Sequence, residues 1–167
     1  MSYIKRTLEK RITEISQEYS CLLLIGPRQV GKTTMLEHLM EGTPRKRVTL
    51  DDVDERKLAK TDPALFLDLH PAPVLIDEVQ YAPELFSYIK IKVDSGAAPG
   101  SFWLTGSQSF RLMELAQESL AGRTAILHMS ALSQNELYGN GETEPFSLDL
   151  AALNRRKELQ SPVSSVL

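Results

Sequence analysis

The sequence CLLLIGPRQVGKTT, from Cys21 to Thr34, joins an apolar run to a loop of defined spacing. Residues 21–25 are all apolar and predict a short buried strand. The loop that follows, Gly26–Thr33, has the phosphate-loop (Walker A) pattern Gly-x-x-x-x-Gly-Lys-[Ser/Thr] and leads into a predicted helix. Strand, loop and helix in this order are the context that the pattern requires, so we interpret the stretch as a phosphate-binding loop.

The chemistry of phosphate binding explains the residue types in this loop. Glycines let backbone amides turn inward around a di- or triphosphate, and the next helix adds the positive end of its dipole. Lys32 would neutralise the β- and γ-phosphates, and Thr33 would bind Mg²⁺. We therefore expect a nucleotide to be held by nine residues: Gly26, Pro27, Arg28, Gln29, Val30, Gly31, Lys32, Thr33 and Thr34.

A second informative stretch is PVLIDEVQ, from Pro73 to Gln80. Its apolar part, Val74–Ile76, does not alternate with polar residues, which is typical of a strand in a parallel sheet covered on both faces. Asp77 and Glu78 follow at the C-terminal end, where ligands of such sheets bind. We expect Asp77 (Walker B) to hold Mg²⁺ directly or through a water, and Glu78 to polarise the water that attacks the γ-phosphate. An exposed acidic turn is the alternative.

Polar residues also follow the predicted strand 102–104 in SFWLTGSQ, from Ser101 to Gln108. In this class of nucleotide hydrolase, a polar side chain at that place senses the γ-phosphate and helps to orient water. Either Thr105 or Ser107 could have this role, although Thr-Gly-Ser turns occur in many proteins.

Two arginines are candidates for electrostatic assistance. Arg28 lies within the phosphate loop, and Arg123 lies between Gly122 and a predicted strand at 124–127. Arg123 is either a salt-bridging surface residue or a charge offered to a phosphate, for example that of a neighbouring subunit.

Apolar periodicity and capping signals predict the remaining elements. We expect helices at 3–19, 32–40, 54–60, 63–69 (capped by Asp62), from Pro83 to near Gly96 and around 112–116, a strand centred on Val48 and Leu50, and a short helix with a Ser133/Glu136 capping box. The first helix is interpreted as packing on the core, with a contact of Tyr3, Ile4 or Arg6 to the nucleotide base as the alternative. The basic triplet 45–47 is interpreted as a solvated loop, with a phosphate-backbone contact as the alternative.

Composition limits the class of protein. The 167 residues suffice for one domain with one sizeable core. Lys plus Arg number 19 against 22 Asp plus Glu, so the net charge of −3 indicates neither nucleic acid nor acidic membrane as a partner, although a local basic surface stays open. Cys21 is interpreted as a small buried residue. No apolar run has signal-peptide or membrane-spanning character, so we expect a cytoplasmic protein.

Taken in order, these motifs resemble those of a group of bacterial and archaeal AAA-type P-loop ATPases, in which an ATPase domain precedes a second, uncharacterised domain. The matching stretches are GPRQVGKTT (26–34), LDD (50–52), PVLIDEVQYAPEL (73–85), LTGSQ (104–108) and LAGR (120–123). The resemblance implies a three-layer α/β P-loop NTPase fold of the additional-strand catalytic-glutamate class, with a five-stranded parallel sheet of order 5-1-4-3-2. It also implies ATP and Mg²⁺ as cofactors.

The resemblance covers about residues 3–138 and divides the chain into two parts. We expect an ATPase domain over residues 1–138, and a linker with a predicted helix at 148–159 within residues 139–167. The second part is interpreted as the remnant of an absent C-terminal domain. We therefore expect a truncated product or fragment in which turnover could be slow and the source of any arginine finger is open.

The motifs predict Mg-dependent ATP binding and hydrolysis that drives a conformational switch. A GTPase would need an Asn-Lys-x-Asp motif, which the sequence lacks, although the loop alone does not distinguish ATP from GTP. A small-molecule phosphotransferase is less favoured, because the pair Asp77-Glu78 suits activation of water better. A non-catalytic ATP-binding interaction module is the third alternative. A protein partner or self-association is compatible with each of these functions.

Overall fold

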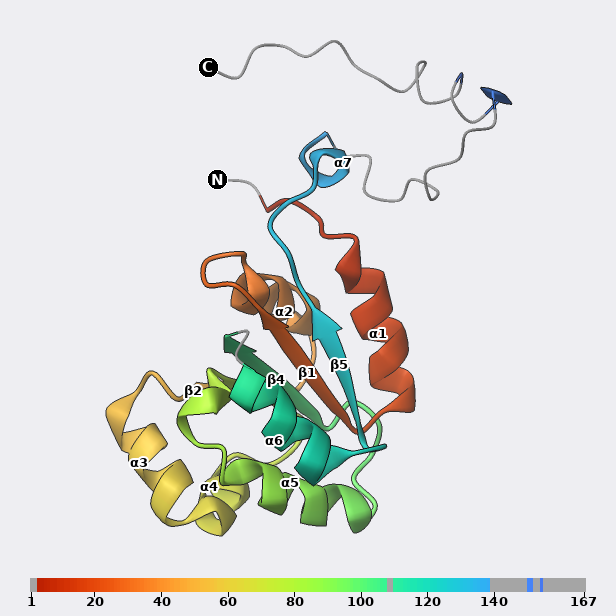
Figure 1. Ribbon diagram of the computed structural model, residues 1–167. Helices are drawn as coiled ribbons and strands as arrows, with labels where there is room; N and C mark the ends of the chain where they lie inside the picture. Colours follow the sequence, from red (N-terminus) through yellow and green to blue (C-terminus); the bar gives the residue numbers. More distant parts are fainter. Residues whose placement is uncertain (1–2, 108–109, 139–149, 152–153, 155–167) are drawn as a thin grey trace.

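A single parallel sheet lies at the centre of the fold (Figure 1). The computed structural model describes residues 3–107, 110–138, 150, 151 and 154. Its strands are β1 (Cys21–Gly26), β2 (Lys46–Thr49), β3 (Val74–Asp77), β4 (Phe102–Ser107) and β5 (Thr124–His128). They pair in the order β2-β3-β4-β1-β5, which is the expected order 5-1-4-3-2 read from the other edge. The fold class implied by the resemblance is confirmed.

The register of the sheet brings the predicted motifs to one edge. Cys21 of β1 lies beside Phe102 of β4 and Thr124 of β5, and at the other end of β1 Gly26 lies beside Ser107. All pairs are parallel, so the C-terminal ends of the strands meet at the same edge. The phosphate loop after β1 and the acidic pair at the end of β3 are therefore neighbours.

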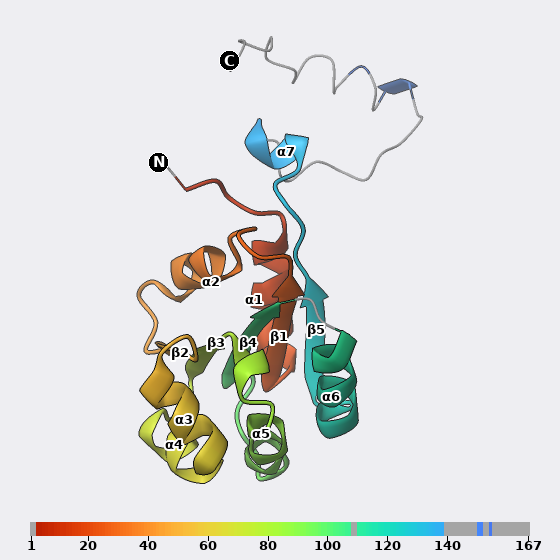
Figure 2. The ribbon, with the colours of Figure 1, turned by 60° about the vertical axis from the view of Figure 1, so that its left-hand side comes forward.

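Helices cover both faces of the sheet, as Figures 1 and 2 show. They are α1 (Leu8–Glu18), α2 (Lys32–Met40), α3 (Val53–Thr61), α4 (Pro63–Leu69), α5 (Leu85–Asp94), α6 (Phe110–Leu120) and α7 (Gln134–Leu137), with a short 3₁₀ helix η1 (Val79–Tyr81). Leu22 and Leu24 of β1 pack into a core with α1 and α2, whereas Leu23 and Ile25 pack into the core formed with α4, α5 and α6. Because both faces of β1 are buried, its sequence is apolar without alternation.

Several helix caps agree with the sequence. The Asp62 carboxylate accepts a hydrogen bond from Leu65 N at 3.0 Å and begins α4, as expected. Ser133 and Glu136 form the predicted capping box of α7.

No helix in the described part of the chain is long and apolar enough to cross a membrane.

Two expectations need correction. The helix predicted at 3–19 begins only at Leu8. Before it, the backbone N–H of Arg6 donates to the Glu9 side chain, and the backbone N–H of Thr7 donates to Glu136 of α7. The basic triplet 45–47 is not a loop, since β2 begins at Lys46, but Lys46 and Arg47 are exposed as expected. The Arg45 guanidinium stacks 3.9 Å from the centre of the Trp103 ring, and burial lowers its pKa to about 10.

The predicted linker and most of the predicted helix at 148–159 lie outside the described residues. Within that range the structure describes Leu150, Ala151 and Asn154, which are helical.

Candidate functional site

The phosphate loop connects the buried strand β1 to α2. Gly26 ends the strand, and Gln29 and Gly31 adopt positive φ angles of 63° and 89°. At Gly26 a Cβ atom would lie 2.2 Å from the Met129 carbonyl oxygen, so only glycine fits this close approach of two backbones. The tight turns and the start of α2 at Lys32 give the loop the geometry that cradles phosphate in proteins.

A cleft of about 500 Å³ lies over the loop. Its lining includes six residues that the sequence predicted for nucleotide contact: Arg28, Gln29, Gly31, Lys32, Thr33 and Thr34. Glu78 from the end of β3 lines the same cleft, so the structure brings the predicted base to the loop. Asp51 and Tyr81 also line it, and the sequence analysis assigned neither.

Lys32 lies close to the backbone of its own loop. Its ammonium group donates to the carbonyl oxygens of Gly26 at 3.0 Å and Pro27 at 2.8 Å. Burial lowers the pKa of Lys32, against the opposing influence of the carboxylates of Glu78 and Asp77. The two carboxylates therefore favour the charged form of Lys32.

The Asp77 carboxylate, at the end of β3, is hydrogen-bonded to side chains from α2 and β4. Oδ1 accepts a hydrogen bond from Thr33 Oγ1 at 3.0 Å and another from Thr105 Oγ1. Thr105 Oγ1 in turn accepts the backbone N–H of Glu78 at 3.2 Å. The residues predicted for Mg²⁺ binding, catalysis and phosphate sensing thus form one connected set at the carboxyl edge of the sheet.

The second oxygen of Asp77 has a partner that the sequence did not indicate. Arg47 Nη2 donates to Asp77 Oδ2 at 2.7 Å, while Arg47 Nη1 donates to Glu37 of α2 at 2.8 Å. Arg47 belongs to β2, which pairs with β3 along Val48↔Ile76 and Thr49↔Asp77. This pairing could not be predicted from the basic triplet, whose composition is equally typical of a surface loop.

Glu78 and Ser107 are linked through Gln80, another residue that the sequence analysis left unassigned. Gln80 Nε2 donates to Glu78 Oε2, and Gln80 Oε1 accepts the backbone N–H of Ser107 at 3.3 Å. Ser107 Oγ is buried and has no hydrogen-bond partner within the described residues. Both predicted phosphate-sensing residues, Thr105 and Ser107, therefore lie near the predicted base.

The structure does not bring Arg123 to this set within its own chain. Arg123 precedes β5 at the end of the sheet where Cys21 pairs with Thr124, opposite the phosphate loop. Its guanidinium donates to Asp94 and to the carbonyl of Ala121 at 3.0 Å. An approach of Arg123 to a phosphate would require a second copy of the chain.

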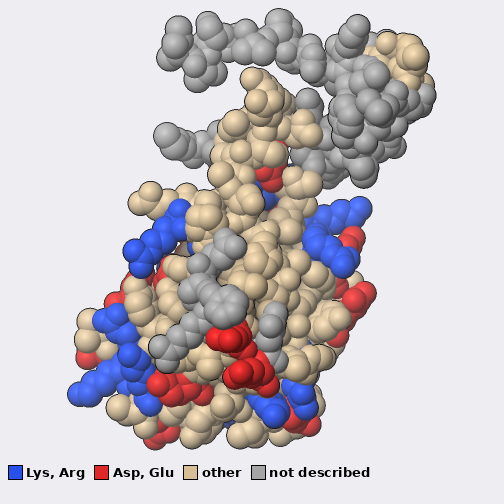
Figure 3. Space-filling view, in the orientation of Figure 1, with Lys and Arg blue, Asp and Glu red and all other residues tan. Residues whose placement is uncertain are grey.

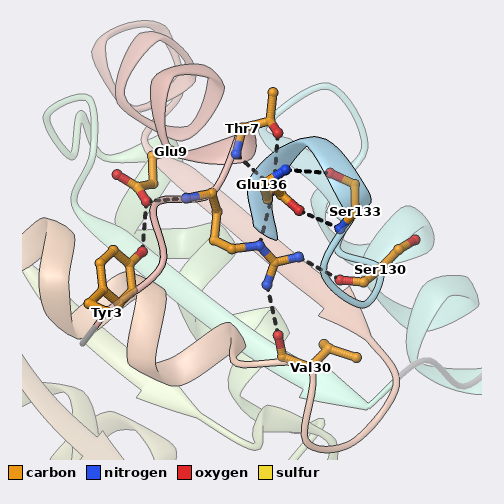
Figure 4. Close-up of polar contacts among 8 residues, drawn as sticks. Tyr3, Thr7, Glu9, Val30, Ser130, Ser133 and Glu136 are labelled. Carbon is orange, nitrogen blue, oxygen red and sulfur yellow. Dashed lines mark hydrogen bonds and ion pairs between the residues drawn. The ribbon is translucent and has the colours of Figure 1, made fainter. Parts of the chain in front are cut away.

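Arg6 connects the phosphate loop to α7 through three partners, Val30, Ser130 and Glu136, which Figure 4 labels. Its guanidinium donates to the carbonyl oxygens of Val30 at 2.9 Å and Ser130 at 2.8 Å, and to the Glu136 carboxylate at 3.1 Å. These bonds use the chain's own acceptors, which favours packing over the alternative of a contact to a nucleotide base.

The donor set is suited to Mg²⁺. No group of three or more His, Cys, Asp and Glu side chains in the described ranges could hold a metal by itself. Thr33 and Asp77 offer one hydroxyl and one carboxylate, and Mg²⁺ is commonly bound by one or two such ligands together with water and substrate phosphates. The residues present therefore fit this ion.

Comparison with known families agrees with this arrangement. A family model described as "AAA domain" matches residues 18–138, from the end of α1 to the residue after α7. The chain belongs to the AAA domain family. The resemblance to prokaryotic AAA-type P-loop ATPases that the motifs indicated is thus confirmed. The matched range spans the predicted site residues, whose roles stay predictions.

Individual relatives of this AAA domain are longer than the chain. Uncharacterized protein Mb2031c of Mycobacterium bovis and uncharacterized protein Rv2008c of Mycobacterium tuberculosis are each 34% identical to it over 134 residues. That match covers 80% of the chain and 30% of each relative, so the chain spans less than a third of their length.

A solved structure supports the fold. The Walker-type ATPase PABY2304 of Pyrococcus abyssi superimposes with a TM-score of 0.56 at 18% sequence identity, over 96% of this chain and 60% of that one. At this identity the likeness bears on the fold alone.

Proposed function

We propose that this AAA domain binds ATP with Mg²⁺ and hydrolyses it, and that hydrolysis drives a conformational switch. The observation that carries the proposal is the junction at Asp77, whose carboxylate accepts from the phosphate-loop hydroxyl of Thr33 and from Thr105, with Glu78 next in sequence. A loop, a hydroxyl and two acids in this arrangement are the parts that phosphoryl transfer to water uses.

The binding roles follow from the position of each group. The backbone N–H groups of residues 26–34, except at Pro27, would donate hydrogen bonds to the phosphates, and the Lys32 ammonium would neutralise their charge. Arg28 lines the same cleft. Thr33 would bind Mg²⁺ through its hydroxyl oxygen while its O–H continues to donate a hydrogen bond to Asp77 Oδ1. The ion supplies charge neutralisation on the β- and γ-phosphates.

The catalytic roles concern one water molecule. Glu78 lines the cleft and would accept the proton of the water whose oxygen attacks the γ-phosphorus, while ADP leaves. Thr105 or Ser107 would sense the γ-phosphate from the end of β4. Arg123 could assist only from a neighbouring copy of the chain. A catalytic role for Arg123 therefore requires self-association.

The class of partner is also a proposal. The family and the absence of a described membrane-spanning helix are compatible with action in the cytoplasm on a protein partner or on a second copy. Figure 3 shows acidic and basic side chains interspersed over one face of the molecule, which gives no support to a basic nucleic-acid surface on that face.

The test uses the chain as it exists, with Lys32→Ala, Glu78→Gln and the matched control Glu84→Gln, an exposed acid. Nucleotide binding is measured by thermal shift with ATP, GTP and ADP, each with Mg²⁺ and with EDTA, and turnover by phosphate release. We expect Lys32→Ala to lose binding, Glu78→Gln to bind ATP without release, and Glu84→Gln to behave as wild type.

The other outcomes separate the alternatives. Binding without phosphate release in the wild type would indicate a non-catalytic module. Release that requires an added acceptor would indicate a phosphotransferase. If no nucleotide stabilises the wild type, the proposal fails for this chain.

A further inference from the structure

Gln80 lies between two groups that the proposed hydrolysis needs. Its side-chain amide donates from Nε2 to the Glu78 carboxylate and accepts at Oε1 from the backbone N–H of Ser107. We propose that Gln80 is a positioning residue that holds the Glu78 carboxylate at a fixed place relative to the end of β4. This inference rests on the hydrolysis proposed above and assigns a further residue to the same site.

The chemistry of the two partners fixes the orientation of the Gln80 amide. An ionised carboxylate can only accept hydrogen bonds, and a backbone N–H can only donate one. The nitrogen of Gln80 must therefore face Glu78, and its oxygen must face Ser107. A glutamate at this position would keep the acceptor for Ser107 but would lose the donor for Glu78.

The backbone brings Gln80 back beside Glu78. Glu78 has φ 60° and ψ 44°, a left-handed conformation that is uncommon for a residue with a side chain. The 3₁₀ turn that follows is closed by a hydrogen bond from Tyr81 N to Glu78 O at 3.1 Å and anchored by the fully buried Val79. A positive φ at a candidate base indicates that the surrounding structure enforces its position.

Gly106 leaves room for the Gln80 side chain. A Cβ atom at Gly106 would lie 3.0 Å from Gln80 Oε1 and 2.5 Å from Leu112 Cδ2. Any larger residue at position 106 of β4 would therefore push against the amide. This accounts for the glycine between the two residues predicted to sense phosphate.

The two oxygens of the Glu78 carboxylate would therefore have different roles. Gln80 donates to Oε2 of Glu78, and we assign Oε1 as the oxygen that takes the proton from water. Loss of the Gln80 donor would let the Glu78 side chain rotate away from that geometry. Displacements of about 1 Å in such groups lower turnover by about a hundredfold, with little effect on ground-state binding of the phosphates.

The experiment compares Gln80→Leu, Gln80→Glu and Glu84→Gln in the full chain. Glu84 lines the neighbouring cavity of about 280 Å³ that Gln80 also lines, but it is outside the proposed machinery. We expect both Gln80 variants to lower kcat at least tenfold while the Kd for ATP, measured by titration in Mg²⁺, changes less than threefold. Glu84→Gln should change neither quantity. A purely packing role would lower Tm in Gln80→Leu and leave kcat of Gln80→Glu unchanged, and that result would overturn the inference.

A second measurement keeps this inference separate from the proposed function. The free energy of unfolding in urea is measured for wild type, Glu78→Ala, Gln80→Leu and the double variant, which forms a double-mutant cycle. A coupling between the two substitutions supports the contact even if the wild type releases no phosphate, in which case the proposed hydrolysis fails by itself. Additive effects of the two substitutions, or full kcat in Gln80→Leu, would overturn the role of Gln80.

Discussion

Arg6 and Glu136 form a buried ion pair of 3.1 Å although 130 residues separate them in the sequence. Their side chains are 8% and 6% exposed. Glu136 Oε1 also accepts from the backbone N–H of Thr7 at 2.8 Å and its hydroxyl at 2.9 Å. The pair therefore ties the segment before α1 to α7, and through Val30 to the phosphate loop.

We expect Arg6→Ala to lower the free energy of unfolding by about 3–5 kcal/mol. Removal of one partner leaves the buried Glu136 carboxylate without its charge partner, which is the costly way to break such a pair. Urea unfolding at pH 7 measures the change. Arg11→Ala is the control, because its pair with Glu14 is 63% and 47% exposed and should contribute less than about 1 kcal/mol. Equal losses in the two variants would contradict this prediction.

The same ion pair predicts a pH dependence. Although burial opposes ionisation, hydrogen bonds from Ser133, Thr7 and Arg6 lower the pKa of Glu136 from 4.5 to about 2. Because the folded-state pKa lies below the unfolded one, the contribution to stability is full above pH 4.5 and is lost as the pH falls toward 2. That contribution is about 3 kcal/mol.

Glu136→Gln measures this contribution directly. The difference in unfolding free energy between wild type and Glu136→Gln should be constant from pH 7 to pH 5 and should shrink between pH 4.5 and pH 2. Urea titrations across this range give the difference. A difference that grows as the pH falls would have the wrong sign for a carboxylate of lowered pKa.

Gly26→Ala should damage the start of the phosphate loop. Its new methyl group would clash with the Met129 carbonyl oxygen. Met129 cannot easily move away, because its backbone N–H donates to the Ile25 carbonyl oxygen at 2.8 Å. We expect a loss of about 1–3 kcal/mol from overpacking and weaker binding of ATP. Gly42→Ala is the control for ATP binding, because no atom lies within 4 Å of its new Cβ, although alanine is strained at the φ of 73° there. If Gly42→Ala weakens ATP binding equally, the close approach at Gly26 is not the cause.

Cys21 should be unreactive in the folded protein. Its side chain is fully buried at the start of β1, and burial raises the pKa of the thiol to about 12. The reactive thiolate is therefore scarce at pH 8, and reagent cannot reach the sulfur. Ellman's reagent should label the protein in urea but not in buffer, and rapid labelling in buffer would show that this end of the sheet opens.

Local sequence features accounted for most of the helices and strands and for the phosphate loop. Apolar runs such as Val74–Ile76 predict strands covered on both faces, because the same pattern is required whichever helices cover them. The spacing from Gly26 to Thr33 indicates a phosphate loop by itself, since the loop, its glycines and the next helix are contiguous in the chain. The acids Asp77 and Glu78 were predicted from their place at a strand end.

Contacts between distant segments depended on the tertiary structure. Arg47 reaches Asp77 because β2 lies beside β3, and Arg6 reaches Glu136 because β5 carries α7 back toward the first helix. The spacing of apolar residues predicts which side chains are buried. The partner of a buried charge depends instead on which strands lie side by side in the sheet. For that reason the sequence alone predicted the loop and the acids, and only the fold determined that Arg123 lies at the far end of the sheet and that Gln80 joins Glu78 to Ser107.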